Sequence, residues 1–443
     1  MSSSLFARVH ARLGRLRALS TLSLILTLPA GAHAAQAEPQ ALTLDQALQQ
    51  AVARSRQLSA HDHAAAAARE MAVAAGQLPD PVLKVGIDNL PVSGTDRLSL
   101  GNDFMTMRRV GLSQELTRTD KLHWRATRLE READKAEAEK ALATASIERD
   151  TAIAWLELFY TGQMASVVST QAATARQEIE AAEAAYRGGR GSQADILAAR
   201  AALLALDDRG SDIGRRLRTA QAMLARWAGA AVAVAGTPSI DRIRLDAAAP
   251  DGELAHHPQI TVLNRQEDIA QADVNLAQAN RRTDWSVEFA FQQRGAAYSN
   301  MVSVGISVPL QWDRKRRQDR ELAAKLALVE QAKAERDEML RDHIAGTRAL
   351  IVAWQSGRER IARYTRDALP LAGERSQAAL AAYRGAKATL AEVLAARRNE
   401  ADIRLQALEL ELDTARLWAQ LNFLVPADDA AQHAAMLNRQ ESK

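Results

Sequence analysis

The chain contains no cysteine and few aromatic residues. Of its 443 residues only 4% are Phe, Trp or Tyr, whereas 25% are charged. The absence of cysteine excludes disulfides, thiolate catalysis, cysteine metal sites and a lipid-modified cysteine anchor. No segment after the N-terminal region approaches the ~20 consecutive apolar residues that a membrane-spanning helix needs. What remains is rich in alanine and charge, which is typical of long helices with narrow packing seams.

Catalytic motifs are also missing. The sequence has no glycine-rich phosphate loop, no nucleophile elbow and no HExxH pair. We therefore expect no enzymatic activity and no cofactor. His61 and His63 would point apart on a helix, and His257-Pro258 is typical of a helix start, so we expect no metal site either.

Residues 1–34 have the pattern of a secretory signal. Arginines precede a short apolar run from Ala18 to Leu28, and Ala32-His33-Ala34 is a small-x-small cleavage site, so we expect the mature chain to begin at Ala35. Removing the four arginines of this segment takes the formal net charge from +3 to −1. No basic face then remains to neutralise phosphates, and we expect no nucleic-acid partner.

The most informative feature is an internal repeat. Residues 186–200, YRGGRGSQADILAAR, recur 197 positions later as residues 383–397, YRGAKATLAEVLAAR. Each copy has a glycine-bearing break, and each then restarts a helix with a capping box, Ser192-x-x-Asp195 or Thr389-x-x-Glu392. The chain is therefore duplicated, and its unit is a pair of long antiparallel helices that meet at a tight tip.

The two halves have the same order of predicted elements. The first repeat covers 35–227, with a helix from Thr43, a strand hairpin over 82–116 and a helical hairpin over 120–227. A linker over 228–252 comes next. The second repeat covers 253–425, with a helix over 253–282, a strand hairpin over 285–310 and a helical hairpin over 313–424, bent near Pro370. A polar tail over 426–443 ends the chain.

The last helix carries two apolar heptad stripes. They are displaced by about 140° around the helix, which suits a helix with a neighbour on each side. A curved wall of helices and a thick bundle both satisfy this pattern, and the wall is favoured. The stripes are Leu405, Leu408, Leu412, Ala415 and Leu410, Leu417, Leu421, Leu424.

The strand hairpins alternate apolar residues with polar, charged and small ones. That pattern fits a barrel that faces water inside and lipid outside, although two ordinary hairpins on a soluble core would have the same alternation. Neither half has a separate apolar domain to cover its hairpin. Four strands cannot close a membrane barrel, and open edges do not survive in lipid. The sequence thus predicts an oligomer, and three copies would supply twelve strands.

The chain resembles the TolC-like outer-membrane factors over about residues 42–425. The resemblance rests on the duplicated plan, the two tips, and the matching strand exits VGLSQEL from Val110 and VGISVPL from Val304. It implies a fold that is mainly α with a small β part: a homotrimer in which a twelve-stranded outer-membrane β-barrel continues as a periplasmic α-barrel. It also implies a passive exit duct of a tripartite efflux system, with a periplasmic adaptor and an inner-membrane RND-type pump as partners.

The same resemblance assigns roles at the tips. Adaptor docking falls on Arg187, Gly188, Gly191, Ser192, Arg384, Gly385 and Thr389, and we expect the tip glycines to provide left-handed backbone. An aperture latch falls on Asp195 and Tyr383. One acidic ring position of the family falls on Glu392, which could also be only a capping-box carboxylate. The second ring position is Ala395 and the latch arginine is Ala388, which implies a less charged aperture unless Lys387 substitutes.

The segments DNLP from Asp88 and DFMTMRR from Asp103 resemble the CzcC-like heavy-metal branch of the family, which serves pumps for copper, silver, cobalt, zinc or cadmium. Met105 and Met107 would share one face of a strand, but two thioethers are too few for a soft-metal site. An exit duct for drugs or secreted proteins would have the same architecture. A periplasmic adaptor or coiled-coil scaffold is a further alternative, although an adaptor would carry one helical hairpin and not two.

Overall fold

The computed structural model describes residues 41–229, 233–245, 247 and 250–426. The predicted signal segment 1–34 and residues 427–443 of the predicted tail lie outside this range. All the described residues belong to one compact unit.

In the first repeat, the capping motifs mark where the helices begin. Thr43 accepts a hydrogen bond from the Gln46 amide and the Gln46 side chain accepts one in return, which starts α1 (Leu44–Arg54). Ser55 interrupts the predicted single helix and caps α2 (Arg56–Ala75). The predicted long arm and its return are α3 (Thr119–Arg187), of 69 residues, and α4 (Gln193–Ala228).

The second repeat is more broken than its sequence suggests. The predicted helix over 253–282 is two helices, α5 (Pro250–Leu254) and α6 (Pro258–Ala279), because Pro258 starts a new helix with His257 as its cap. The arm predicted from residue 313 begins only at α7 (Gln318–Arg363). A π-helical turn, η1 (Tyr364–Ala368), leads into α8 (Leu369–Arg384), so the predicted bend lies directly before Pro370. The chain returns as α9 (Leu390–Asn422).

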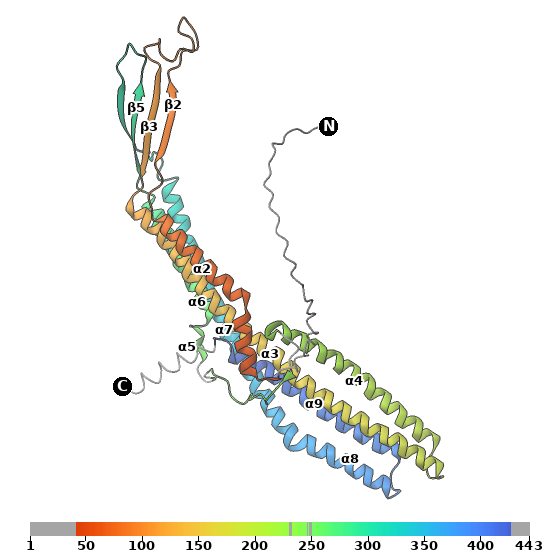
Figure 1. Cartoon of the computed structure of the whole chain (residues 1–443). Helices are drawn as coiled ribbons and strands as arrows, with labels where there is room; N and C mark the ends of the chain where they lie inside the picture. Colours follow the sequence, from red (N-terminus) through yellow and green to blue (C-terminus); the bar gives the residue numbers. More distant parts are fainter. Residues whose placement is uncertain (1–40, 230–232, 246, 248–249, 427–443) are drawn as a thin grey trace, which may run out of the picture. The chain divides into compact units, whose positions relative to one another are not determined.

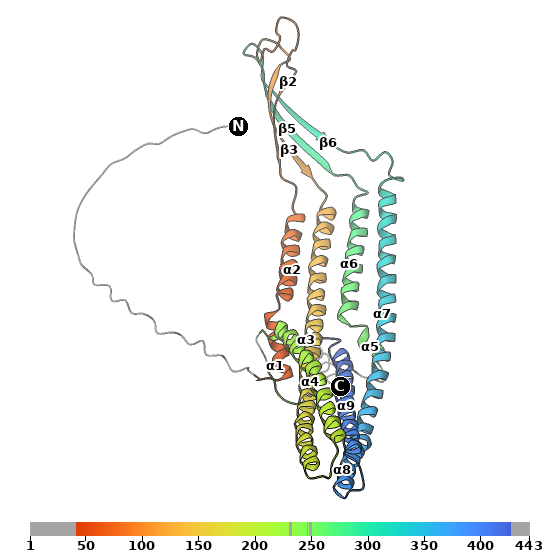
Figure 2. The ribbon, with the colours of Figure 1, turned by 90° about the vertical axis from the view of Figure 1, so that its right-hand side faces the viewer.

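The long helices pack side by side. Helix α3 contacts α2 and α6, and α6 contacts α7, so these four form a row, which is seen face-on in Figure 2 and with its helices overlapping in Figure 1. Helix α9 contacts α3 as well as α7 and α8. Helix α9 thus has more than one neighbouring helix, as both the wall and the bundle interpretation of its two stripes expect.

The main hydrophobic core lies where α3, α4, α7 and α9 meet the segment between the repeats. Three buried tryptophans of the helices donate hydrogen bonds from their indole N–H groups to backbone carbonyls of non-helical segments there. Trp155 donates to Leu42 at 2.9 Å, Trp354 to Ile240 at 3.2 Å and Trp418 to Arg242 at 2.7 Å. Two short parallel strands, β1 (Ala41–Leu42) and β4 (Ala233–Val234), pair beside them. The described part of the predicted linker is thus packed onto the helices.

The second sheet has four antiparallel strands, β2 (Val82–Asp88), β3 (Met107–Leu116), β5 (Trp285–Gln293) and β6 (Met301–Ser307), in the order β2-β3-β5-β6. Each predicted hairpin is present, and β3 pairs with β5 to join the two repeats. The predicted strand over 302–310 ends at Ser307, because Pro309 cannot donate to a ladder.

Candidate functional site: the sheet and the two helical tips

One face of the sheet is apolar and open. The register aligns apolar rows across all four strands, Leu83–Leu112–Phe289–Val304 and Val85–Val110–Phe291–Val302. Within this chain these side chains have no covering layer: Val85 is 71% exposed and Val304 is 69% exposed. Contiguous apolar surface of this kind marks a face that contacts another apolar phase.

The opposite face is polar and charged. The Glu288 carboxylate pairs with the Lys84 ammonium at 2.6 Å and with the Arg109 guanidinium, which also lies 3.8 Å from Asp88. Gly111 leaves room on this face for the buried Ala290 of the next strand, because a Cβ at residue 111 would lie 3.0 Å from the Ala290 Cβ. The alternation predicted from sequence thus separates charge from apolar surface across one sheet.

The sheet has two free edges in the chain as described. Strands β2 and β6 each pair with one neighbour only. Closed membrane barrels begin at about eight strands, so this four-stranded sheet is not closed by one chain.

The first tip joins α3 to α4 through a Schellman motif. The Arg190 amide donates to the Ala185 carbonyl at 2.9 Å, the Gly189 amide donates to Tyr186 at 3.0 Å, and Gly189 has a left-handed φ of +69°. Ser192 then starts α4, because its hydroxyl accepts from the Asp195 amide and the Asp195 carboxylate accepts from the Ser192 amide at 2.9 Å.

The second tip has the same bonds with different residues. The Lys387 amide donates to the Ala382 carbonyl at 2.8 Å, and the left-handed residue is Ala386, with a φ of 55°. Thr389 and Glu392 form the capping box. The expectation that the tip glycines as a group provide left-handed backbone holds for Gly189 alone. It was wrong for Gly188 and Gly385, whose φ values are −83° and −84°, and for Gly191, which does not have a positive φ.

Most of the predicted docking residues are exposed at these tips. Arg187, Gly188, Ser192, Arg384, Gly385 and Thr389 are exposed, and Gly191 is half-buried. Gly191 packs tightly, since a Cβ there would lie 3.2 Å from the Ala185 Cβ. By contrast, a Cβ at Gly385 would make only ordinary contacts, the nearest at 3.5 Å.

The three predicted aperture residues do not form one group. Asp195 and Glu392 are both engaged in their own capping boxes. Tyr383 packs against the small apolar cluster of Ala182, Leu390 and Val393 that joins the two tips. Across the described ranges, no hydrogen bond links Tyr383 to Asp195.

We expected no metal site, and the histidines are the residues that bear most directly on this expectation. His257 is buried and its Nδ1 accepts from the Gln259 amide at 3.1 Å as the cap of α6. His61 lies 3.7 Å from the Glu139 carboxylate. In the part of the chain that the structure describes, no three His, Asp or Glu side chains gather closely enough to hold a metal ion.

Among the described helices, none combines the length and the apolar content that crossing a bilayer requires.

Comparisons with known proteins identify the fold. No family model and no curated protein matches the chain. Solved structures do: the outer-membrane channel OprN superposes with a TM-score of 0.73 at 18% identity, over 86% of this chain and 89% of that one. The Campylobacter jejuni CmeC outer-membrane channel superposes with a TM-score of 0.72 at 11% identity, over 89% of this chain and 88% of that one. CusC, a protein whose structures describe the formation of a transmembrane channel, superposes with a TM-score of 0.71 at 15% identity, over 86% of this chain and 91% of that one. The chain has the fold of the TolC-like outer-membrane channels.

The channel fold confirms the resemblance drawn from the duplicated tips. The structure also contains a groove that we did not predict from the sequence. It has a volume of about 770 Å³, lies behind the tips and is lined by α3, α4 and α9. Glu178 and Arg397 form an ion pair in it at 2.6 Å. Burial raises the pKa of the Glu178 carboxyl, and the Arg397 charge opposes that rise. Alanines line much of the groove, and nothing in their spacing distinguishes them from ordinary helix seams.

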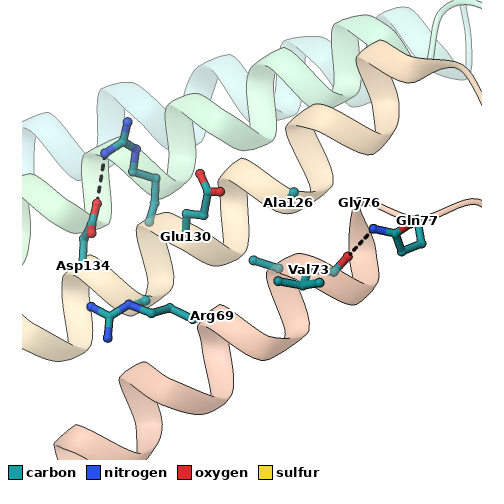
Figure 3. Close-up of a pocket in the computed structure, with 10 residues that line it drawn as sticks. Arg69, Val73, Gly76, Gln77, Ala126, Glu130 and Asp134 are labelled. Carbon is teal, nitrogen blue, oxygen red and sulfur yellow. Dashed lines mark hydrogen bonds and ion pairs between the residues drawn. The ribbon is translucent and has the colours of Figure 1, made fainter.

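A second hollow, between α2 and α3, has no comparable organisation. It has a volume of about 720 Å³ and is lined by Arg69, Val73, Gly76, Ala126 and Glu130, among others (Figure 3). Its charged residues make local contacts, since Arg131 pairs with Asp134 at 3.0 Å and Arg69 pairs with Glu137. The first pair lies within α3 and the second joins α2 to α3, and neither suggests any chemistry.

Proposed function

We propose that this protein is the outer-membrane component of a tripartite efflux system. Three copies close a twelve-stranded barrel in the outer membrane, and their helices form a periplasmic duct. The observation that carries the proposal is the four-stranded sheet, which has an exposed apolar face and two free edges. In lipid each unpaired backbone group costs several kcal/mol, so a membrane position requires closure by further copies.

The sheet's polar face supports the same assignment. In a closed barrel the ion pairs of Glu288 with Lys84 and Arg109 line the water-filled side, and the apolar rows contact lipid. The duct is passive: it binds no cofactor, and an inner-membrane pump of the RND type supplies the energy.

The two tips dock on a periplasmic adaptor. Their exposed residues Arg187, Gly188, Arg384 and Gly385 leave main chain accessible to a partner, and the capping boxes hold the tips in shape. Docking opens the aperture through a rearrangement of the helices behind the tips, with Asp195, Tyr383 and Glu392 near the constriction.

Bulky substitution at the tips tests docking. Gly385→Leu and Gly188→Leu introduce side chains where the backbone is not left-handed and where only ordinary contacts await a Cβ. The expected result is loss of efflux-dependent resistance while the trimer still assembles. Ala386→Leu at the same tip is a poor control because its backbone is left-handed; Leu371→Ala, on the exposed surface of α8, is the matched control. Normal resistance in both glycine variants would refute docking at the tips.

The proposed cargo is heavy-metal cations, supported by the resemblance of the Asp88 and Asp103 segments to the CzcC-like branch. Growth of a deletion strain on copper, silver, zinc, cobalt and cadmium, compared with growth on drugs, distinguishes the cargo classes. Sensitivity to drugs alone would contradict metal export and favour the drug-exporting alternative.

A further inference from the structure

The two repeats differ at the point where the sheet passes into the long helices. In the first repeat α3 starts at Thr119, three residues after β3 ends at Leu116. In the second repeat the matching position would start α7 near residue 313, but α7 starts at Gln318. The additional non-helical residues are Asp313, Arg314, Lys315, Arg316 and Arg317, so we call residues 312–317 the basic turn.

The cations of the basic turn are largely unpaired. Arg314 lies 3.6 Å from Asp319, a carboxylate that it shares with Arg281. Lys315, Arg316 and Arg317 are exposed, and none of them forms an ion pair with any described residue.

The acids nearby do not neutralise these three cations. The Asp313 carboxylate accepts a hydrogen bond from the Arg316 backbone amide at 3.2 Å, which holds the turn closed without neutralising a side chain. Asp319 is already shared between Arg281 and Arg314. The turn therefore presents excess positive charge to its surroundings.

The first repeat handles the same junction in the opposite way. Lys121 is buried and pairs with Asp284 at 2.6 Å, and Arg118 lies 3.5 Å from Asp120. These two cations are therefore paired with carboxylates of the same chain. The junction of the first repeat thus forms without unpaired cations, so the fold alone does not explain the three unpaired cations at the junction of the second repeat.

An exposed aromatic side chain stands beside the free cations. Trp312 is 88% exposed, and Leu310 just before it is 66% exposed. Both follow β6, whose apolar residues Val302, Val304 and Ile306 belong to the open face of the sheet. Tryptophan is enriched at the boundary between hydrocarbon and water, and Lys and Arg next to that boundary attract anionic headgroups.

We infer that the basic turn binds the phosphate headgroups of anionic phospholipids at the periplasmic edge of the barrel. The inference rests on the proposed function, because that function places the sheet in the outer membrane and the helices in the periplasm. Trp312 lies at the level of the ester groups, and Lys315, Arg316 and Arg317 face the headgroup phosphates. The trimer carries three such turns, and it therefore holds a ring of anionic lipid around its base.

The absence of cysteine allows a local measurement. Leu310→Cys gives the full-length protein a single thiol next to the turn, and a fluorophore on that thiol reports nearby lipid after reconstitution into vesicles. Quenching by headgroup spin-labelled phosphatidylglycerol is compared with quenching by spin-labelled phosphatidylcholine. One Lys or Arg near an anionic surface favours binding by about five-fold. The expected preference for phosphatidylglycerol is therefore at least about ten-fold, and it falls with added salt.

Two triple variants decide the assignment. K315Q/R316Q/R317Q is expected to abolish the preference, whereas R360Q/R363Q/R375Q, which removes three exposed cations from α7 and α8, is expected to keep it. Equal quenching by both lipids in the parent protein overturns the inference, and so does an equal loss in both variants. If the first triple variant does not assemble, R316Q/R317Q is measured, with the same loss expected. A protein that never enters vesicles overturns the proposed function as well, whereas one that enters without preference overturns this inference alone.

Discussion

At the scale of single residues, the two tips show how a duplicated motif tolerates different residues. Both tips close with the same backbone bonds, but the left-handed position is Gly189 in the first and Ala386 in the second. A left-handed alanine costs roughly 1–2 kcal/mol because its Cβ approaches the following carbonyl. The second tip is thus held in shape by its surroundings, including the apolar cluster around Leu390 and Val393.

Ala386→Gly is expected to stabilise the protein by about 1 kcal/mol, because glycine adopts the left-handed region without that strain. Gly189→Ala, where the Cβ would meet nothing within 4 Å, is expected to destabilise it by a similar amount through backbone strain alone. Thermal midpoints of the purified protein measure both. Changes of the same sign in the two variants would contradict the assignment of matching left-handed positions.

His257 makes stability depend on pH. Burial, with the nearby His343 ring as a smaller cause, lowers the pKa of His257 to about 4. An unfolded histidine has a pKa near 6.5. Between pH 6.5 and pH 4 the histidine is protonated in the unfolded chain but neutral in the folded chain. The free energy of unfolding therefore has its full value above about pH 6.5 and decreases as the pH drops towards 4. The loss at pH 4 should reach about 3 kcal/mol.

His257→Asn is the matched variant, because asparagine is also a good helix cap and does not titrate. Its thermal midpoint is expected to depend less on pH between 4 and 6.5 than that of the parent protein. The pKa of His343 is also lowered by burial, although the Asp342 charge opposes this, so part of the dependence should remain. An unchanged pH profile in the asparagine variant would place the effect elsewhere.

At the scale of elements, α7 and α9 are in tight contact at a glycine. A Cβ on Gly357 would lie 2.4 Å from the Thr414 Oγ1 atom, and Thr414 is itself buried and donates to the Leu410 carbonyl. This contact lies just before the π-helical turn at Tyr364–Ala368. The two helices are therefore tightly packed before that turn, and α9 goes on to contact α8 beyond it.

Gly357→Ala is expected to destabilise the protein by about 1–3 kcal/mol, because the added methyl group overpacks the contact. Thr414→Ala removes the nearest two atoms and should restore part of the loss when the two changes are combined. A thermal double-mutant cycle measures the coupling, expected at about 1 kcal/mol or more. Strictly additive midpoints would mean that the helices separate freely at this point.

The elements also show where sequence reasoning succeeds. Helix starts with a side-chain signal were predicted to within a residue, as at Ser192, Thr389 and Thr43, because the capping box is local chemistry. The start of α7 was missed by five residues: the segment from Asp313 is polar and charged like a helix surface, and Arg317 provides no side-chain cap. The left-handed Ala386 was missed because propensity favours glycine and only tertiary contacts hold an alanine there.

At the scale of the molecule, the alternation of residues predicted the sheet faces, and the duplication predicted one strand hairpin in each repeat, whereas the pairing of β3 with β5 is seen only in the structure. The groove around Glu178 and Arg397 could not be predicted, since it depends on how far α4 stands from α9. The register shows which face of the sheet is apolar, and the proposed function turns that face toward lipid. This assignment can be tested by placing one charge on either face.

Val304 and Ser303 are adjacent on β6 and point to opposite faces of the sheet. Val304 belongs to the central apolar row, so Val304→Lys should cost roughly 2–4 kcal/mol per chain, the penalty of a lysine near the middle of a bilayer. Ser303→Lys places the same charge on the polar face, which the proposed barrel turns toward water. It should cost far less, beyond the 3.1 Å hydrogen bond from Gln292 that it removes. The yield of assembled trimer in outer-membrane fractions measures the difference. Since the proposed trimer contains three copies, the penalty is multiplied, and Val304→Lys should nearly eliminate assembly while Ser303→Lys retains it. Equal yields would mean that the exposed apolar rows do not contact lipid, and the membrane barrel would have to be abandoned.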